Sequence, residues 1–395
     1  MKTKLSIIVA ALSCVLSGTV SAIEIYKDEK TSVSTRGILR LVFESNSSSD
    51  EITDGGSRWG FDVKREIGSG WTAGITTEWA MSFENNKNFS VSVVGNDANL
   101  AAGDSGDTFS SRLGHLTFTH DHWGKIAVGK QWGVYYDVAG RTDMFNYWGG
   151  SAAGVYNFAG DGGLSGTGRA EQALTWRKSF GNFNLGLQYQ AQDERVVLNV
   201  PECDSALPDG EFADICSLLN GADLGTVGNG YGISLSYQFD NTVWLGFSSN
   251  IAELEAGADN EDIFGISRDE DDVVNVFAAS YGTFNDGLYA AITYANSEFH
   301  EIDNAGNLID AEGGEIIIRY TMDYGTSVYA GANRLTSDGS ENQYEINYEL
   351  IGADYPFMDN VGVMFFEMRF NDSTNADGSQ GNDNNDIAVG VKVNL

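Results

Sequence analysis

The chain has 395 residues with 48 Gly, only 3 Pro and a formal net charge of −33. This acidity argues against a nucleic-acid partner, which needs a basic surface. A mean hydropathy of −0.22, with no apolar run of about 18 residues after the first two dozen positions, excludes a helical membrane protein. Disorder is excluded as well, because 42% of the residues are apolar and 12% are aromatic.

The first 22 residues have the pattern of a cleaved secretory signal. Lys2 and Lys4 precede an apolar stretch over 5–16, and Val20-Ser21-Ala22 offers a small-residue cleavage site. The apolar stretch is shorter than the ~20 residues that a membrane-spanning helix needs. We therefore expect residues 1–22 to be removed and residues 23–395 to form one exported domain.

From residue 23 onward, apolar residues recur at every second position in short segments. The C-terminal segment shows this most clearly, because Ile387, Val389, Val391 and Val393 alternate with small or polar residues. Helical spacing is hardly ever sustained. Turn signals divide the alternating segments into about sixteen predicted strands, at 32–44, 57–66, 71–83, 110–119, 124–131, 168–178, 183–192, 230–239, 242–252, 272–281, 287–297, 314–322, 326–335, 344–354, 361–371 and 386–395.

The second face of these strands decides the architecture. Opposite the apolar positions stand mainly Gly, Ser, Asn and Gln, as in segments 184–190 and 232–238. A soluble sandwich would turn Lys and Glu outward, whereas a membrane barrel has an apolar outside and a wet inside. Short links also alternate with long acidic ones, as periplasmic turns alternate with outer loops. The sequence thus predicts an all-β fold, a transmembrane antiparallel β-barrel.

Two cysteines remain after the signal, Cys203 and Cys216, in one polar stretch with 12 residues between them. An exported chain meets an oxidising compartment, so we expect a loop disulfide. Metal ligation is the alternative, which the absence of His between them disfavours. We expect no cofactor, although the acidic loops could loosely hold Ca²⁺ or Mg²⁺ that bridges lipopolysaccharide phosphates. The stretch 383–386 offers oxygen ligands without the spacing of a calcium loop.

Local motifs resemble those of the Gram-negative trimeric porins, the general diffusion porins. Segments 57–61 (SRWGF) and 66–70 (EIGSG) resemble their second strand and first turn. Segment 129–137 (GKQWGVYYD) is similar to the end of the fifth strand and the start of the third loop, and 168–170 with 181–189 to the next hairpin. The likeness extends in pattern over the mature chain. The terminal Leu395 departs from the usual Phe, which puts assembly efficiency in doubt.

This resemblance implies a homotrimer in the outer membrane, in contact with lipid and lipopolysaccharide, that passes ions and small hydrophilic solutes. It also implies that the third loop, 132–167, folds inward and narrows the channel. Carboxylates on the loop opposite cations on the wall would create a transverse field that orients polar solutes. The loop candidates are Asp137, Asp143 and Asp161.

Strand parity and the resemblance suggest the wall cations. For Arg58 the parity is clearest, because Trp59, Phe61 and Val63 occupy the other face. An arginine facing hydrocarbon at mid-membrane would cost ~2–4 kcal/mol, which favours the lumen. A position near a rim, with the side chain snorkelling or paired, is the alternative for each. The wall candidates are Arg36, Arg40, Arg58, Arg112, Lys130, Arg169 and Arg177.

The third loop is also rich in rings, at Trp132, Tyr135, Tyr136, Phe145, Tyr147 and Trp148. These rings either pack the loop against the wall or stack on sugars, and the second reading would make the protein a saccharide-selective porin. Loss of Lys2 and Lys4 with the signal takes the net charge from −33 to −35. The mouths should therefore attract cations, and we predict cation selectivity.

Two other classes compete with a channel. An enzyme is disfavoured because the chain has only 4 His, and His120 and His122 lie in a predicted turn without a further metal ligand. His300 lies in a predicted outer loop with no serine elbow nearby. A structural or adhesive barrel would use long acidic loops equally well, and ionic conductance is what separates it from an open channel.

Overall fold

The computed structural model describes residues 23–47, 49–83, 87–94, 97–104, 109–156, 160–197, 223–240, 242–256, 270–305, 307–339, 342–358 and 361–395. The expected signal, Cys203 and Cys216 lie outside these residues. Within them, no helix is long and apolar enough to cross a membrane.

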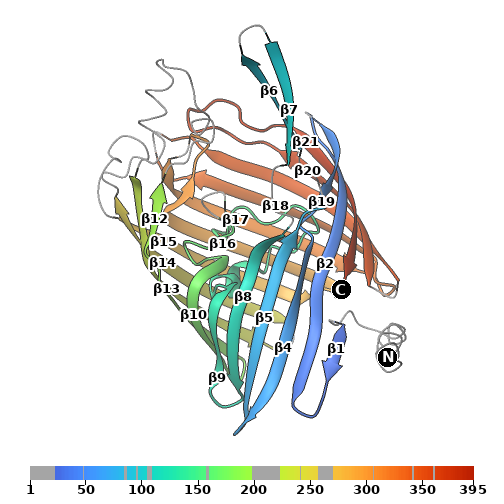
Figure 1. Ribbon diagram of the computed structural model, residues 1–395, viewed down its shortest axis with the longest axis vertical. Coiled ribbons are helices and arrows are strands. Elements are labelled where there is room, and N and C mark those ends of the chain that lie inside the picture. The colour runs from blue at the N-terminus through green and yellow to red at the C-terminus, as the bar shows by residue number, and fades with distance from the viewer. Residues whose placement is uncertain are drawn as a thin grey trace.

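The described strands form one large sheet that closes on itself (Figure 1). The wall has sixteen strands: β2 (Thr31–Ser45), β4 (Arg58–Gly68), β5 (Trp71–Met81), β8 (Phe109–His120), β9 (Gly124–Trp132), β10 (Arg169–Phe180), β11 (Phe183–Gln190), β13 (Asp223–Phe239), β14 (Val243–Ala256), β15 (Glu270–Thr283), β16 (Asp286–Ile302), β17 (Leu308–Thr321), β18 (Ser327–Ser337), β19 (Glu345–Phe357), β20 (Gly362–Asn371) and β21 (Asn385–Asn394).

Each wall strand pairs antiparallel with its neighbour along the chain, and the last strand pairs with the first. In that closing pair Arg40 on β2 lies opposite Lys392 on β21. Closure removes the open edges that a sheet in a membrane could not tolerate, because hydrocarbon offers no hydrogen-bond partner to a free edge. The predicted antiparallel barrel and all sixteen predicted strands are therefore confirmed.

Several elements go beyond the prediction. Three short strands extend the sheet, β1 (Glu24–Lys27) and β3 (Asp50–Asp54) on β2 and β12 (Glu194–Val197) on β13. A separate hairpin, β6 (Lys87–Val94) with β7 (Asp97–Asp104), lies between β5 and β8. One helical turn, α2 (Tyr136–Ala139), follows β9. These elements are short or lie in the loops, where period-two alternation does not distinguish a strand from coil.

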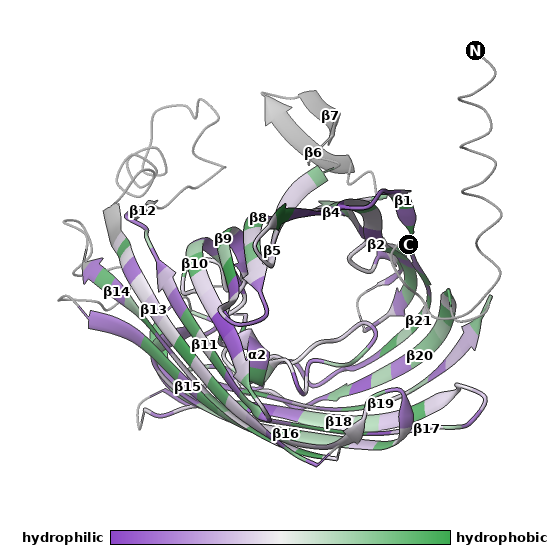
Figure 2. Ribbon diagram, turned by 90° about the horizontal axis from the view of Figure 1, so that it is seen from below, coloured by the Kyte–Doolittle hydropathy of each residue, from purple (hydrophilic) through white to green (hydrophobic). Residues whose placement is uncertain are grey.

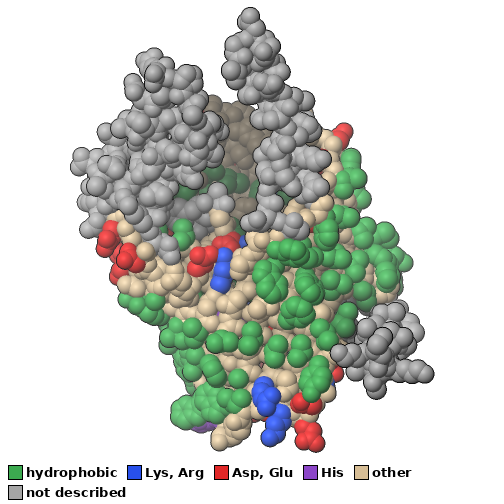
Figure 3. Space-filling model, viewed as in Figure 1, with side chains coloured by type: hydrophobic (Ala, Val, Ile, Leu, Met, Phe, Trp, Pro, Cys, Tyr) green, Lys and Arg blue, Asp and Glu red, His purple; other side chains and the backbone are tan. Residues whose placement is uncertain are grey.

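The barrel has its apolar side chains on the outside. Outward positions such as Ile292, Ile318 and Phe277 are 53%, 50% and 57% exposed, and Figure 3 shows apolar side chains over the outer face. The alternate positions carry buried polar groups, among them Asn250, Glu315 and Glu367. Seen from below, the strands form a ring, and α2 lies within it (Figure 2). The predicted apolar outside and polar inside are confirmed.

Candidate functional site

The segment between β9 and β10, residues 133–168, is held at its base by ion pairs to these two strands. Asp137 in α2 lies 2.7 Å from Nε of Arg177. Asp161 pairs with Arg169 at 3.0 Å and with Lys130 at 3.3 Å. Burial alone would raise the pKa of Asp161, but Arg169 and Lys130 outweigh it and hold the pKa below its usual value of 3.8. The Asp161 carboxylate thus closes the base of the segment while it is ionised.

The tip of the segment, residues 146–148, is held by a carboxylate on the barrel wall. Glu367 on β20 is fully buried and accepts the backbone N–H groups of residues 146, 147 and 148 at 2.5, 3.0 and 3.2 Å. The hydroxyl of Tyr329 donates a fourth hydrogen bond at 2.9 Å. A buried carboxylate with several donors is stable because each bond to the charged group offsets part of its desolvation.

A second wall carboxylate holds the segment further along the sheet. Glu315 on β17 accepts the N–H of Ala152 at 2.8 Å and the hydroxyl of Thr142. Two glycines make room for this contact. A methyl group at Gly313 would overlap the carbonyl oxygen of Ala152, and one at Gly331 would overlap the ring of Phe145. The segment therefore lies closer to β17 and β18 than a residue larger than glycine at these two positions would allow.

A third anchor joins the segment to β15 and β16. His300 and Asp272 are both buried, with the ring Nδ1 2.5 Å from the Asp272 carboxylate. The other ring nitrogen lies 2.8 Å from the carbonyl oxygen of Gly154. Nearby, the buried Tyr135 donates its hydroxyl to the carbonyl oxygen of Ala153 at 2.8 Å. His300 thus has a structural role that links the segment to the wall.

Three of the predicted wall arginines meet at one carboxylate that the sequence analysis did not select. Glu78 on β5 is 4% exposed and lies 3.0 Å from Arg112, 3.3 Å from Arg36 and 3.8 Å from Arg58. Arg36 is also 3.5 Å from Asp62. Three arginines against the two carboxylates Glu78 and Asp62 leave one positive charge in surplus on this part of the wall. We call Arg36, Arg58, Arg112 and Glu78 the arginine cluster.

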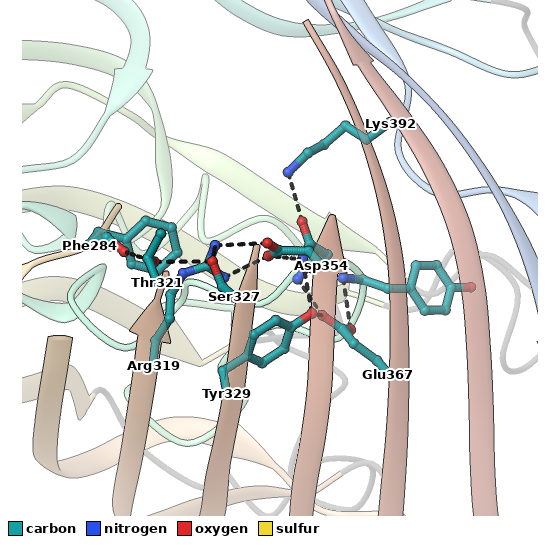
Figure 4. Close-up of polar contacts among 10 residues, drawn as sticks. Phe284, Arg319, Thr321, Ser327, Tyr329, Asp354, Glu367 and Lys392 are labelled. Atoms are coloured by element: carbon teal, nitrogen blue, oxygen red, sulfur yellow. Dashed lines mark hydrogen bonds and ion pairs between the residues drawn. The ribbon is translucent and has the colours of Figure 1, made fainter. Parts of the chain in front are cut away.

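A second polar cluster lies on the inner face of strands β17 to β21 (Figure 4). Arg319 contacts both carboxylate oxygens of Asp354, at 2.7 and 3.1 Å, and stacks between the rings of Phe284 and Tyr329. Lys392 donates to the Asn146 side-chain oxygen at 2.7 Å. Asn146 in turn donates to Asp354 at 3.2 Å. The tip of the segment is thereby joined to the buried Arg319–Asp354 ion pair.

The other predicted residues have separate places. Asp143 stays within the segment, where its carboxylate accepts hydroxyl groups from Tyr136 and Tyr156 at 2.9 and 2.8 Å. Arg40 lies on the lumen face of β2 beside Gly55 and Ser57. Among the described residues, none of the three predicted loop aspartates forms an ion pair with the arginine cluster.

None of the six predicted loop rings is exposed. Trp132 stacks on Tyr136 with ring centroids 4.0 Å apart. Trp148, with Phe145 and Tyr147 beside it, packs in the cluster that includes Leu350 on β19. The hydroxyl of Tyr147 also donates to Glu44 at 2.5 Å. The rings therefore pack the segment against the wall.

Sequence reasoning missed Glu78, Glu315 and Glu367. All three stand at lumen positions of predicted strands, and the signal that could have found them is an acidic residue next to at least one apolar neighbour on the other face. In the described part of the chain, no three His, Cys, Asp or Glu side chains group as a metal site. His120 stacks near Trp71, with centroids 5.0 Å apart.

Comparison with known proteins agrees with this geometry. A profile described as Gram-negative porin matches residues 8–376. Outer membrane protein S2 of Salmonella typhi is 25% identical over 92% of this chain and 91% of its own length. Outer membrane porin PhoE of Escherichia coli K12 is 23% identical over 99% of this chain and 98% of its own.

Solved structures show the same fold. The Salmonella typhi OmpF complex with daunomycin has a TM-score of 0.67 at 19% identity and covers 94% of this chain and 100% of its own. An anion-selective porin from Comamonas acidovorans has a TM-score of 0.62 at 16% identity, with 93% and 100% covered. The trimer form of OmpT from Vibrio cholerae has a TM-score of 0.61 at 15% identity, with 93% and 100% covered.

Proposed function

The chain belongs to the Gram-negative porins, passive channels of the outer membrane and not enzymes, and from this premise we propose a cation-preferring diffusion channel for ions and small hydrophilic solutes. The observation that carries the proposal is the distribution of side chains, which are apolar on the outside of the barrel and polar on the inside. Apolar side chains such as Ile292 and Phe277 face outward, while Asn250, Glu315 and Glu367 lie on the inner face. A lipid-facing exterior around a polar interior is what an aqueous path through a membrane requires.

Segment 133–168 is proposed as the constriction of this channel. Its anchors on Glu367, Glu315 and His300 lie on the inner face of strands far from β9 and β10, where the segment begins and ends. The arginine cluster is proposed as the basic side of the narrowest region. A field between fixed charges of opposite sign there would orient dipolar solutes as they pass.

The cation preference is proposed to arise at the outer mouth. Outer-loop positions carry Asp50, Glu51, Asp372 and Asp377, and segment 257–269, which lies outside the described residues, adds further acids. Such a surface concentrates cations within a Debye length of ~10 Å at 0.1 M salt. Since the arginine cluster has the opposite sign, we expect a moderate preference that high salt reduces.

The test is a planar-bilayer recording with the purified, folded protein. A steady ohmic current, with a reversal potential in a KCl gradient that favours K⁺ at low salt, is expected. Equal permeability of K⁺ and Cl⁻ would overturn the cation preference and leave the channel itself in place. A barrel without any current would favour a structural or adhesive role instead.

Further parts of the proposal concern assembly. We infer a cleaved signal over 1–22 and a homotrimer in contact with lipid and lipopolysaccharide; the trimer form recorded for Vibrio cholerae OmpT supports the trimer. A heat-sensitive slow band in detergent gels tests the trimer. The backbone N–H of Leu395 donates to Gly37 at 2.9 Å, which supports a C-terminus integrated into the sheet without a terminal Phe.

A further inference from the structure

A cavity of about 480 Å³ lies beneath α2 at the ends of the strands that carry the short turns. Its lining comes from α2 and Arg141 just after it, and from β8 with its following turn, β9, β10, β11, β13 and β14. A second cavity of about 570 Å³ shares Lys125, Asp137 and Arg177 with it, so the two are adjoining parts of one space. In the porin orientation this space opens toward the periplasm.

The charges of the first cavity do not cancel. Each nitrogen of the Arg177 guanidinium donates one hydrogen bond, to Asp137 at 2.7 Å, to the carbonyl oxygen of Trp132 at 2.8 Å and to the hydroxyl of Thr175 at 3.0 Å. Within the described residues, neither Lys125 nor Arg141 has a carboxylate at ion-pair distance. Lys178 and Asp121 also line the cavity, so four cations stand against two carboxylates and the lining has two positive charges in excess, in a chain whose net charge is −33.

The Arg141 side chain is held in a conformation that suits the binding of an oxyanion. Its guanidinium lies 4.0 Å from the centroid of the buried Trp244 ring. The hydroxyl of Tyr289 donates to its backbone carbonyl at 2.8 Å. A guanidinium that stacks by its face keeps its N–H groups in plane for an acceptor, and a fixed side chain loses little entropy when it binds one.

Neutral polar groups line the same cavity. Asn184, Ser234 and Ser236 come from β11 and β13 and offer amide and hydroxyl groups. The Asn184 amide already donates to Ser236 at 3.3 Å, so the two are close neighbours. Such groups exchange hydrogen bonds readily with the hydroxyl groups of a solute.

We propose that this cavity is a binding subsite for small hydroxylated organic dianions, with Lys125 and Arg141 as the charged contacts. The shared chemistry is a pair of negative charges beside hydroxyl groups, as in a sugar phosphate or a hydroxy dicarboxylate. The inference rests on the proposed channel function. It gives the pore a basic inner vestibule below its acidic outer mouth.

The experiment records single-channel current at 0.1 M KCl with glucose 6-phosphate or tartrate added from the periplasmic side. Both dianions should block the current in a saturable way, and glucose at equal concentration should not. Lys125→Gln and Arg141→Gln should each raise the half-blocking concentration about tenfold, the value of one charge-assisted hydrogen bond. Block by only one dianion assigns the subsite to phosphate esters or to dicarboxylates.

Two controls keep the test decisive. Lys125→Arg retains the charge and should retain the block. Lys27→Gln removes a charge that pairs with Glu24 outside the cavity and should leave the block unchanged. An ohmic channel that neither dianion blocks, or an equal block in the Lys125→Gln/Arg141→Gln double variant, overturns the subsite while the channel function stands. The absence of any current would overturn both.

Discussion

Removal of the Glu367 carboxylate should loosen the tip of segment 133–168. In Glu367→Ala the N–H groups of residues 146–148 lose their acceptor. Each buried, unsatisfied N–H costs about 1–3 kcal/mol. Because lumen water can reach the vacated space, we take the lower bound, about 3 kcal/mol for the three groups together.

A loss of about 3 kcal/mol raises the population of the detached segment about 100-fold. A detached tip moves into the lumen, so single-channel recordings should show frequent partial closures and greater current noise. The isosteric Glu367→Gln keeps an acceptor oxygen without the charge and should show a smaller increase. The segment should also become more sensitive to protease in the Ala variant.

The matched control is Glu349→Gln on β19, where the side chain is exposed. It removes a carboxylate without touching the segment and should leave the closures at the wild-type frequency. If Glu367→Ala had the same closure frequency and protease resistance as the wild type, the anchoring role derived for Glu367 would be refuted.

Three further predictions concern charge and covalent structure. Glu78→Gln leaves three arginines without their shared anion and should shift the K⁺/Cl⁻ permeability ratio about two- to fourfold toward Cl⁻, measured as the reversal potential; an unchanged ratio would place the cluster outside the ion path. Because the pKa of Asp161 lies below 3.8 in the folded state, its stabilisation of the segment's base is complete above that value and is lost as the pH falls through the lower, folded pKa. Closures should accordingly rise only below pH 3.8, and a rise near neutral pH would contradict the role of Asp161. Intact mass before and after reduction should differ by the two hydrogens of a Cys203–Cys216 disulfide, and equal masses would exclude the bond.

The barrel was predictable because a membrane imposes one simple pattern on every strand. In β21 the apolar residues Val389 and Val391 face lipid at 49% and 42% exposure, while the intervening Gly390 faces inward. Alternation of this kind locates a strand and its faces without knowledge of its partners. The ends of β16 and β17 that face each other along the chain were less predictable. β16 continues to Ile302 and β17 begins at Leu308, and both of these ends lie beyond the apolar alternation.

The site was only partly predictable because it depends on contacts between distant parts of the chain. Parity assigned Arg36 and Arg58 to the inner face, yet it could not identify Glu78 as their common partner. Similarly, composition indicated an unusual third loop but not that Glu367, about 220 positions later, binds its tip. Gly313 and Gly331 look like ordinary strand glycines in the sequence, and only the approach of the segment explains them.

The contacts separate the charged side chains that hold segment 133–168 from those that do not, a distinction that the sequence does not make. Wall carboxylates Glu315 and Glu367 are occupied by loop donors, and the loop aspartates Asp137 and Asp161 are occupied by neighbouring strands. The anions around segment 133–168 are thus engaged in holding it, whereas the cations Lys125 and Arg141 are not. In the proposed channel, the chain-wide charge of −33 is therefore expected to govern the field at the outer mouth, and local pairing the field inside. For this channel we expect the net charge to determine which ions approach the pore, and the unpaired Lys125 and Arg141 to determine which solutes it retains.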